Sequence, residues 1–246
     1  MEKIKSIIEV KNLNKSFGSN HVLRDFSMEV VPGESLVILG KSGSGKSVLI
    51  KCIINLIEPD SGEIYVLGQN IRELDQDQMD KLRAEVGFLF QSNALYDSMT
   101  VRQNLEFPLR RHWTKEMRDL NAQSAVKEAL EDVGLGHTID MMPAELSGGM
   151  RKRIALARTL ILKPKVILYD EPTTGLDPIT AREISELMLR VQEKYKASSI
   201  IISHDMNCIR MTSDRVIMLI DGRNYISDTY ENLQNIPDPK VREFFD

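Results

Sequence analysis

A glycine-rich octapeptide early in the chain constrains the fold more than any other feature. It reads Gly40-Lys41-Ser42-Gly43-Ser44-Gly45-Lys46-Ser47, which matches the pattern G-x-x-x-x-G-K-[S/T] in full. A short apolar run at residues 35–39 precedes it, and the pattern after it predicts a helix over residues 47–57. A loop of this kind between a buried strand and a helix presents backbone N–H groups to a polyphosphate. The sequence therefore predicts an α/β core whose ligand is a nucleoside triphosphate.

Each residue type in this loop has a predicted use, and all eight residues are candidate nucleotide contacts. Glycines at positions 40, 43 and 45 allow the backbone to approach the phosphates closely. Lys46 is expected to reach the β- and γ-phosphates of the nucleotide, and the Ser47 hydroxyl is expected to ligate Mg²⁺. The alternative is a flexible glycine turn, against which the strand, the helix and the Lys-Ser pair all argue.

A pair of acidic residues follows a second buried strand. Residues 166–169 are hydrophobic, and Asp170 and Glu171 come directly after them. Ligands bind at the carboxyl ends of the strands in open α/β sheets, so both carboxylates are expected at that edge. Asp170 is predicted to hold Mg²⁺, and Glu171 to polarise an attacking water. Two surface acids at the end of a strand are the alternative, which the phosphate loop in the same chain disfavours.

His204 occupies an equivalent place after a third strand. It follows residues 198–203, which contain three consecutive isoleucines. A single histidine is often structural, but this one is expected at the sheet edge that already holds the phosphate loop and the acidic pair. The sequence therefore favours a functional role for His204.

The remaining patterns predict a parallel sheet interrupted by a helical segment. Strand, helix and strand alternate around a helix expected at residues 179–195. Between about residues 100 and 158 the pattern is helical, with a period near 3.6 residues. The expected strands are residues 7–13, 22–31, 35–39, 63–67, 86–90, 166–169, 198–203, 215–220 and 224–227.

The composition of the chain indicates the kind of cellular compartment in which it functions. Its 246 residues are 42% hydrophobic, which suffices for a full core without disulfides. The two cysteines show no framework or metal-ligand spacing, which favours a reducing compartment. Residues 1–10 lack the apolar stretch of a signal peptide, and no segment approaches the length of a spanning helix. The chain is expected to reach a membrane only through a partner. Its net charge of −4 argues against a protein that binds nucleic acid.

A pentapeptide between the phosphate loop and the acidic strand carries a family resemblance. Leu146-Ser147-Gly148-Gly149-Met150 resembles the signature motif of ATP-binding-cassette (ABC) ATPases. The other motifs of that family appear in the same order and span nearly the whole chain. They are Phe17, the phosphate loop, Gln91, Asp170-Glu171-Pro172, Gly175-Leu176-Asp177 and His204.

The resemblance implies a definite architecture. The fold class is α/β, a P-loop NTPase core of the ABC ATPase type with an antiparallel β subdomain and a helical insertion. The implied parts are a RecA-like core with the β subdomain at about residues 1–91 and 163–236, the helical insertion at about 92–162, and a C-terminal tail at 237–246.

The resemblance also implies residue roles and a second copy of the chain. Two copies pack head to tail, so that the signature of one closes over the γ-phosphate held by Lys46 of the other, and the trans signature residues are Ser147, Gly148, Gly149 and Met150. A helix N-terminus at Ser147 would supply the second anion site. Asp177 would lie at the dimer seam, and Phe17 would stack on adenine, unless it is a core residue. The implied catalytic residues are Glu171, His204 and Gln91, and the implied Mg²⁺ ligands are Ser47, Gln91 and Asp170.

Two features resemble one subgroup of the family. Methionine stands at position 150 in place of the family's usual glutamine, and the ending over residues 237–245 is also similar to the MlaF-type ATPases of MCE/Mla phospholipid transporters. This resemblance implies movement of phospholipids between membranes to maintain outer-membrane lipid asymmetry. It implies an integral-membrane permease, an MCE-domain protein and accessory subunits as partners, and a peripheral place at the cytoplasmic face of the inner membrane.

Several alternatives stay open at this point. The chain could be the ATPase of a different ABC importer or extrusion system, a soluble ABC protein that acts on ribosomes or DNA, or a nucleotide-binding regulator with little turnover. The implied permease groove near Gln91, Leu95, Tyr96 and Met99 could equally be core. The tail, with Val241, Phe244 and Phe245 as apolar anchors, is expected to dock on a neighbouring subunit or to fold onto its own domain.

Overall fold

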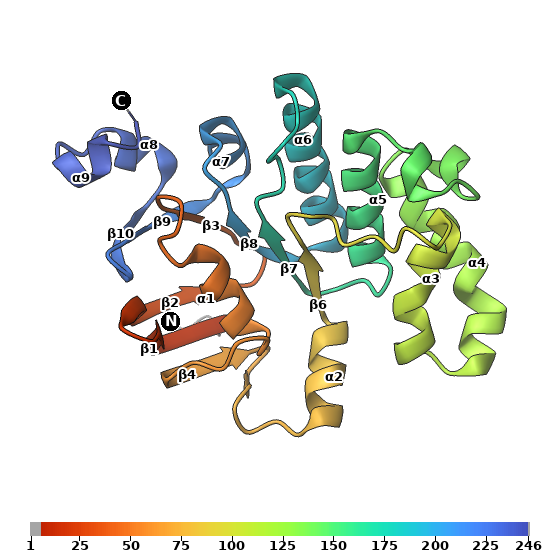
Figure 1. Cartoon of the computed structure of the whole chain (residues 1–246), viewed down its shortest axis with the longest axis horizontal. Helices are drawn as coiled ribbons and strands as arrows, with labels where there is room; N and C mark the ends of the chain where they lie inside the picture. The colour runs from red at the N-terminus through yellow and green to blue at the C-terminus, as the bar shows by residue number, and fades with distance from the viewer. Residues whose placement is uncertain (1–5, 246) are drawn as a thin grey trace.

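The computed structural model describes residues 6–245, and its centre is a six-stranded sheet (Figure 1). The expectations for residues 1–5 and for Asp246 lie outside the described residues. The strand order is β10-β9-β3-β8-β7-β6, in which β10 is antiparallel to β9 and all other neighbours are parallel. The strands are β3 Ser35–Leu39, β6 Val86–Leu89, β7 Val166–Asp170, β8 Ser198–Ile202, β9 Arg215–Ile220 and β10 Arg223–Asp228.

A second sheet is wholly antiparallel. Its order is β2-β1-β4-β5, with β1 at Ile8–Phe17, β2 at Asn20–Val30, β4 at Ser61–Val66 and β5 at Gln69–Asn70. β1 continues four residues beyond the predicted end because it forms a hairpin with β2 that closes at Phe17 and Asn20. The α/β class and the antiparallel β subdomain predicted from the sequence are confirmed.

The helices are unevenly distributed around the two sheets. In Figure 1, α6 and α7 lie above the six-stranded sheet, and α1 lies below it beside the antiparallel sheet. Helices α3, α4 and α5 gather at one end. The helices are α1 Lys46–Ile53, α2 Gln76–Ala84, α3 Val101–His112, α4 Lys115–Asp132, α5 Gly148–Leu160, α6 Pro178–Tyr195, α7 Met206–Thr212, α8 Tyr230–Gln234 and α9 Pro239–Arg242, with 3-10 turns at Gly136–Thr138 and Pro143–Glu145.

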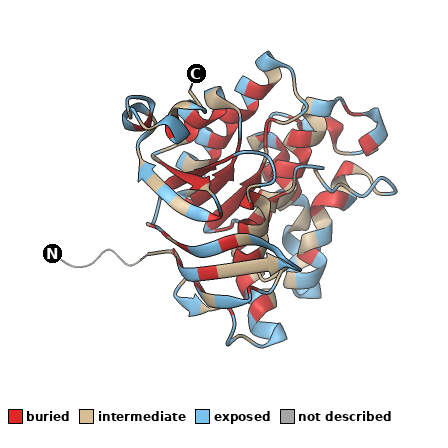
Figure 2. Cartoon of the chain, turned by 60° about the vertical axis from the view of Figure 1, so that its left-hand side comes forward, coloured by how far each residue is buried: buried red, intermediate tan, exposed pale blue. Residues whose placement is uncertain are grey.

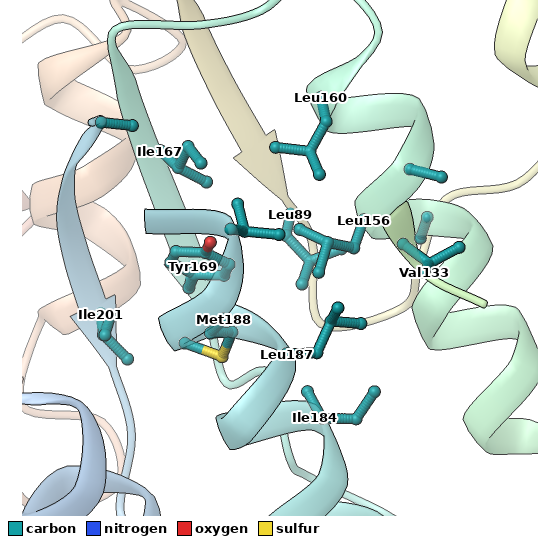
Figure 3. Packing of buried hydrophobic residues seen from close by; sticks show 14 of the residues in the cluster. Leu89, Val133, Leu156, Leu160, Ile167, Tyr169, Ile184, Leu187, Met188 and Ile201 are labelled. Atoms are coloured by element: carbon teal, nitrogen blue, oxygen red, sulfur yellow. The ribbon is translucent and has the colours of Figure 1, made fainter. Parts of the chain in front are cut away.

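The core lies on both faces of the six-stranded sheet, whose inner strands are buried throughout (Figure 2). Successive side chains of a strand point to opposite faces, so Val37 and Leu39 join the cluster under the helices. Leu36 and Ile38 join the cluster under the antiparallel sheet. In Figure 3, Leu156 of α5 and Leu187 of α6 converge on Leu89 of β6. Helix α5, which begins within the signature motif, is therefore fixed to the sheet by apolar packing.

Two helix predictions differ from the structure. The helix after the phosphate loop ends at Ile53 rather than at residue 57, because Asn55 adopts a left-handed conformation with φ of 54°. The N–H of Leu56 then donates to Lys51 O, which closes the helix end. Helix α2 was not predicted, because only Met79 and Leu82 are buried in it and the apolar period is weak.

The tail packs on its own chain. Val241 is fully buried in the cluster under the helices, and the Phe245 ring lies 5.6 Å from the Tyr230 ring. This is the second of the two arrangements expected from the sequence. Because Val241 is buried in its own chain, it is not available as an anchor on a neighbouring subunit. Within residues 6–245, no helix is both long and apolar enough to cross a membrane.

Candidate nucleotide site

The strand order brings the predicted site residues to one edge of the six-stranded sheet. β6, β7, β8 and β3 are adjacent and parallel, so the segments after their carboxyl ends lie together. A pocket of about 730 Å³ is formed there. Its walls include the phosphate loop together with Phe17, Gln91, Glu171 and His204.

The phosphate loop has a backbone that glycine alone fits at two positions. Gly43 and Gly45 have φ of 78° and 104°, values that side chains rarely tolerate. A Cβ at Gly45 would also lie 2.7 Å from Val22 Cγ1, and one at Gly40 would lie 2.7 Å from Leu219 O. The backbone angle at Gly43, close packing at Gly40 and both causes at Gly45 explain why the motif needs glycine at these positions.

Lys46 lies inside the loop that it follows. Its Nζ donates hydrogen bonds to Gly40 O at 2.7 Å and to Lys41 O at 3.0 Å. Burial lowers the pKa of this ammonium, and the nearby charges of Glu171 and Asp170 oppose that shift. The ammonium is therefore held beside the loop amides, where a phosphate would bind.

Ser47 and Asp170 form the pair that fits Mg²⁺. Ser47 Oγ donates to Asp170 Oδ1 at 2.9 Å, and Asp170 is only 6% exposed. A hydroxyl and a carboxylate are the oxygen ligands that Mg²⁺ takes from proteins when phosphates supply others. Among the described residues no group of three or more His, Cys, Asp or Glu side chains could hold a metal alone. The donor set therefore fits Mg²⁺ bound together with a polyphosphate.

One polar atom of the loop also fits an anionic ligand. Ser44 Oγ is buried and has no hydrogen-bond partner among residues 6–245. Buried hydroxyls are normally satisfied, and α1 begins at Gly45 without a side-chain cap. An acceptor placed at this helix end would pair with these free donors.

Glu171 is held in a strained conformation. Its φ is 52°, and its N–H donates to Ile202 O at 2.9 Å. Its Oε2 accepts a hydrogen bond from Thr174 Oγ1 at 3.2 Å and lies 2.8 Å from His204 Nδ1. Strain of this kind persists where surrounding contacts fix it, often at functional sites. The structure thus brings Glu171 and His204 together in one hydrogen-bonded pair.

Gln91 and Phe17 both line the pocket; Gln91 comes shortly after β6, and Phe17 is the last residue of β1. The Phe17 ring is 50% exposed, so the core alternative is wrong for this residue, and stacking on adenine stays a prediction. Gln91 is exposed, and its main-chain oxygen accepts a hydrogen bond from Lys152 Nζ at 3.0 Å.

The signature residues lie in a different place from the phosphate loop. Ser147 caps α5 by accepting a hydrogen bond from the Met150 N–H at 3.2 Å. Gly148, Gly149 and Met150 line a separate pocket with the segment that ends at Asp177. Asp177 in turn caps α6 through the N–H groups of Ile179 and Thr180. Within one chain, the signature residues and Asp177 therefore line one pocket, and the phosphate loop lines another.

Three residues at the nucleotide pocket or on the Gln91 loop were not predicted to belong to the site. Glu243 and Phe244 of the tail line the pocket, and Glu243 Oε2 lies 2.5 Å from Lys41 Nζ. No local pattern indicates that the chain end returns to this edge. Lys152 could have been found, because Lys152, Leu156 and Leu160 recur every four residues and the last two are apolar.

Comparison with known proteins agrees with this geometry. The family model described as "ABC transporter" matches residues 23–174. The probable ribonucleotide transport ATP-binding protein mkl of Mycobacterium leprae is 40% identical over 96% of this chain and 68% of its own length. The methionine import ATP-binding protein MetN of Campylobacter jejuni is 35% identical over 97% of this chain and 75% of its own length. The chloroplastic protein TRIGALACTOSYLDIACYLGLYCEROL 3 of Arabidopsis thaliana is also 35% identical, over 97% of this chain and 73% of its own length.

A solved structure shows the same fold. A dimeric ATP-binding cassette bound to ADP and phosphate, in a post-hydrolysis state, superposes with a TM-score of 0.82 and 31% identity. The match covers 90% of this chain and 98% of that chain.

Proposed function

The chain belongs to the ABC transporter family, and from that premise we propose that it binds and hydrolyses ATP as the energising subunit of a membrane transporter. The observation that carries this proposal is the meeting of Lys46, the Ser47–Asp170 pair and Glu171 at one sheet edge. These groups supply a phosphate site, oxygen ligands and a base within a single pocket.

The chain's own residues divide the chemistry among them. Lys46 and the N–H groups at the start of α1 bind the phosphates, and Ser47 with Asp170 and Gln91 would hold Mg²⁺. When bound, Mg²⁺ neutralises charge on the β- and γ-phosphates. Glu171 orients the attacking water and accepts its proton. His204 fixes the Glu171 carboxylate through the 2.8 Å contact and would face the terminal phosphate of a bound nucleotide.

A complete site needs a second copy of the chain in this proposal. The signature end of α5 offers backbone N–H groups to an anion, yet it lies in a different pocket from Lys46. The similar cassette is dimeric in its post-hydrolysis state. We therefore place Ser147 to Met150 of one copy over the γ-phosphate bound by the other, with Asp177 at the seam.

Replacing Glu171 by glutamine tests the hydrolytic role. Glu171→Gln keeps the shape of the side chain and removes the base, so steady-state hydrolysis is expected to fall at least about 100-fold. ATP should then hold the variant as a stable dimer in size-exclusion chromatography with light scattering. Glu193→Gln, on the exposed side of α6, is the matched control. Hydrolysis retained in Glu171→Gln would overturn the assignment of the base.

The permease contact is proposed at the end of the molecule where α3 lies. Tyr96 is 42% exposed and stacks at 4.7 Å on Phe107, which is 41% exposed. Leu95 and Met99 beside them are half-buried. An exposed aromatic pair beside half-buried apolar side chains suits contact with an amphipathic helix. This contact would hold the chain at the cytoplasmic face of the inner membrane.

For the cargo we propose phospholipid, moved by a complex that contains an MCE-domain protein. Met150 and the ending over residues 237–245 support this choice, and one relative bears the name of a galactolipid. The names of two other relatives give ribonucleotide transport and methionine import, so a polar-solute importer is the second candidate.

Purification of the intact complex through a tag on this chain separates the two cargoes. The lipid proposal expects a permease, an MCE-domain protein and bound phospholipid in the preparation. Stimulation of ATP hydrolysis by methionine or a ribonucleotide, with no MCE-domain protein present, would support the second candidate instead.

A further inference from the structure

Side chains of the signature helix α5 hold the loop that carries Gln91. The loop follows β6 over residues 90–96, and main-chain oxygens of β6 and of this loop accept hydrogen bonds from three α5 side chains. The bonds are Thr159 Oγ1 to Phe88 O at 3.3 Å, Lys152 Nζ to Gln91 O at 3.0 Å, Arg158 Nη2 to Asn93 O at 3.1 Å and Arg158 Nη1 to Ala94 O at 2.7 Å. One helix therefore fixes the loop at several points along its length.

Lys152 is an unusual residue at its position. It is 2% exposed. Among residues 6–245, its ammonium makes a single hydrogen bond, which it donates to Gln91 O. Burial lowers the pKa of this ammonium, and the charge of Asp170 opposes that shift. Burying a charged group costs free energy unless its partners compensate. A methionine would fill the same space without that cost, so packing does not explain the lysine.

The backbone of the loop is strained at two positions. Asn93 and Ala94 both have left-handed backbones, with φ of 64° and 51°, a conformation that costs free energy for residues other than glycine. Arg158 donates to the carbonyls of both residues. The contacts from α5 therefore compensate a strained backbone next to Gln91.

We infer that Lys152 is a positioning residue, which sets the place of Gln91 in the nucleotide pocket, while Arg158 holds Asn93 and Ala94. The inference rests on the proposed function, in which Gln91 acts at the Mg²⁺ site. Helix α5 begins at the signature residue Ser147 and carries Lys152 within its first two turns. A single rigid element thus joins the half-site presented to the partner copy to a residue of the chain's own pocket.

A double-mutant cycle separates this role from a merely structural one. Lys152→Met removes the charge and keeps the volume, and it is expected to lower kcat at least about tenfold with KM for ATP changed less than about twofold. In a Gln91→Ala background, where the side chain to be positioned is gone, Lys152→Met should cause less than about a twofold further loss. Lys152→Arg should restore part of the activity, because a guanidinium can also donate to Gln91 O. Lys81→Met, on the exposed side of α2, is the control.

Equal losses from Lys152→Met in the wild-type and Gln91→Ala backgrounds would overturn the inference. So would an unchanged kcat in Lys152→Met when the wild-type chain hydrolyses ATP. Hydrogen exchange gives a readout that needs no turnover: amides at residues 91–96 should exchange faster in Lys152→Met than in Lys81→Met, and equal rates would contradict the anchoring. Failure of the wild-type chain to hydrolyse ATP would count against the proposed function, and the exchange result would still decide whether Lys152 holds the loop.

Discussion

The N-termini of α1 and α5 are the same kind of element in very different surroundings. α1 begins at Gly45 with no side-chain cap, and its first turn carries Lys46 and Ser47. α5 begins at Ser147, whose own hydroxyl caps the Met150 N–H. Both ends present amides to an anion, but the first end alone is supplied with an ammonium, a paired carboxylate and a base.

The cations near α5 are already engaged. Arg151 Nη1 donates to Leu146 O at 2.7 Å, and Arg153 Nη2 lies 2.5 Å from Glu183 Oε2. The α5 end can therefore add hydrogen-bond donors to a phosphate without being able to hold a nucleotide alone. In the proposed dimer, one chain carries a binding half-site at α1 and a closing half-site at α5, and the two half-sites should respond differently to mutation.

The largest expected effect comes from the α1 end. Lys46→Ala removes the ammonium from the phosphate loop, so hydrolysis should fall at least about 100-fold and ATP affinity should fall with it. Fluorescence titration with a labelled nucleotide measures the affinity. Lys51→Ala, in the last turn of the same helix, should bind ATP as the wild type does. Unchanged ATP affinity in Lys46→Ala would remove the distinction between the two helix ends.

A smaller loss of ATP hydrolysis, without a loss of ATP binding, is expected at the α5 end. Ser147→Arg places a bulky side chain at the proposed seam, so hydrolysis should fall about 10- to 100-fold while ATP still binds to the single chain. The combination of ATP titration and turnover separates this outcome from the previous one. Ser124→Arg, on the exposed side of α4, serves as the control. If Ser147→Arg abolished ATP binding itself, the two ends would not be independent.

The smallest effect concerns the adenine. Phe17→Ala should weaken ATP binding about fivefold, because base stacking on an exposed ring contributes at the low end of about 1–3 kcal/mol. Phe17→Tyr should bind ATP as tightly as the wild type, since the aromatic face is kept. Equal affinities of Phe17→Ala and the wild type for ATP would show that the ring does not contact the base.

Local sequence patterns predicted the parts of the molecule that depend on local rules. The phosphate loop, the strands β3, β7 and β8, and the fold class follow from glycine geometry and apolar runs. These features recur because a few neighbouring residues determine them.

The features that were not predicted depend on contacts between distant segments. Ala94 adopts a left-handed backbone, and its carbonyl accepts a hydrogen bond from Arg158 of α5. No pattern in the residues next to Ala94 indicates this contact. The contact of Glu243 with Lys41 joins the chain end to the phosphate loop. Helix α2 is the exception, because a local cap specifies it: Asp75 and Gln78 bond reciprocally, and an apolar period does not reveal such a cap.

Mixing two inactive variants tests most directly the claim that the two helix ends serve different nucleotides. Lys46→Ala and Ser147→Arg are each expected to be nearly inactive, because each damages both sites of a symmetric dimer. In a mixed dimer, the intact phosphate loop of the Ser147→Arg copy meets the intact signature of the Lys46→Ala copy. An equimolar mixture should therefore recover about a quarter of the wild-type hydrolysis rate if the copies pair at random. A rate no higher than that of the two separate variants would contradict the account.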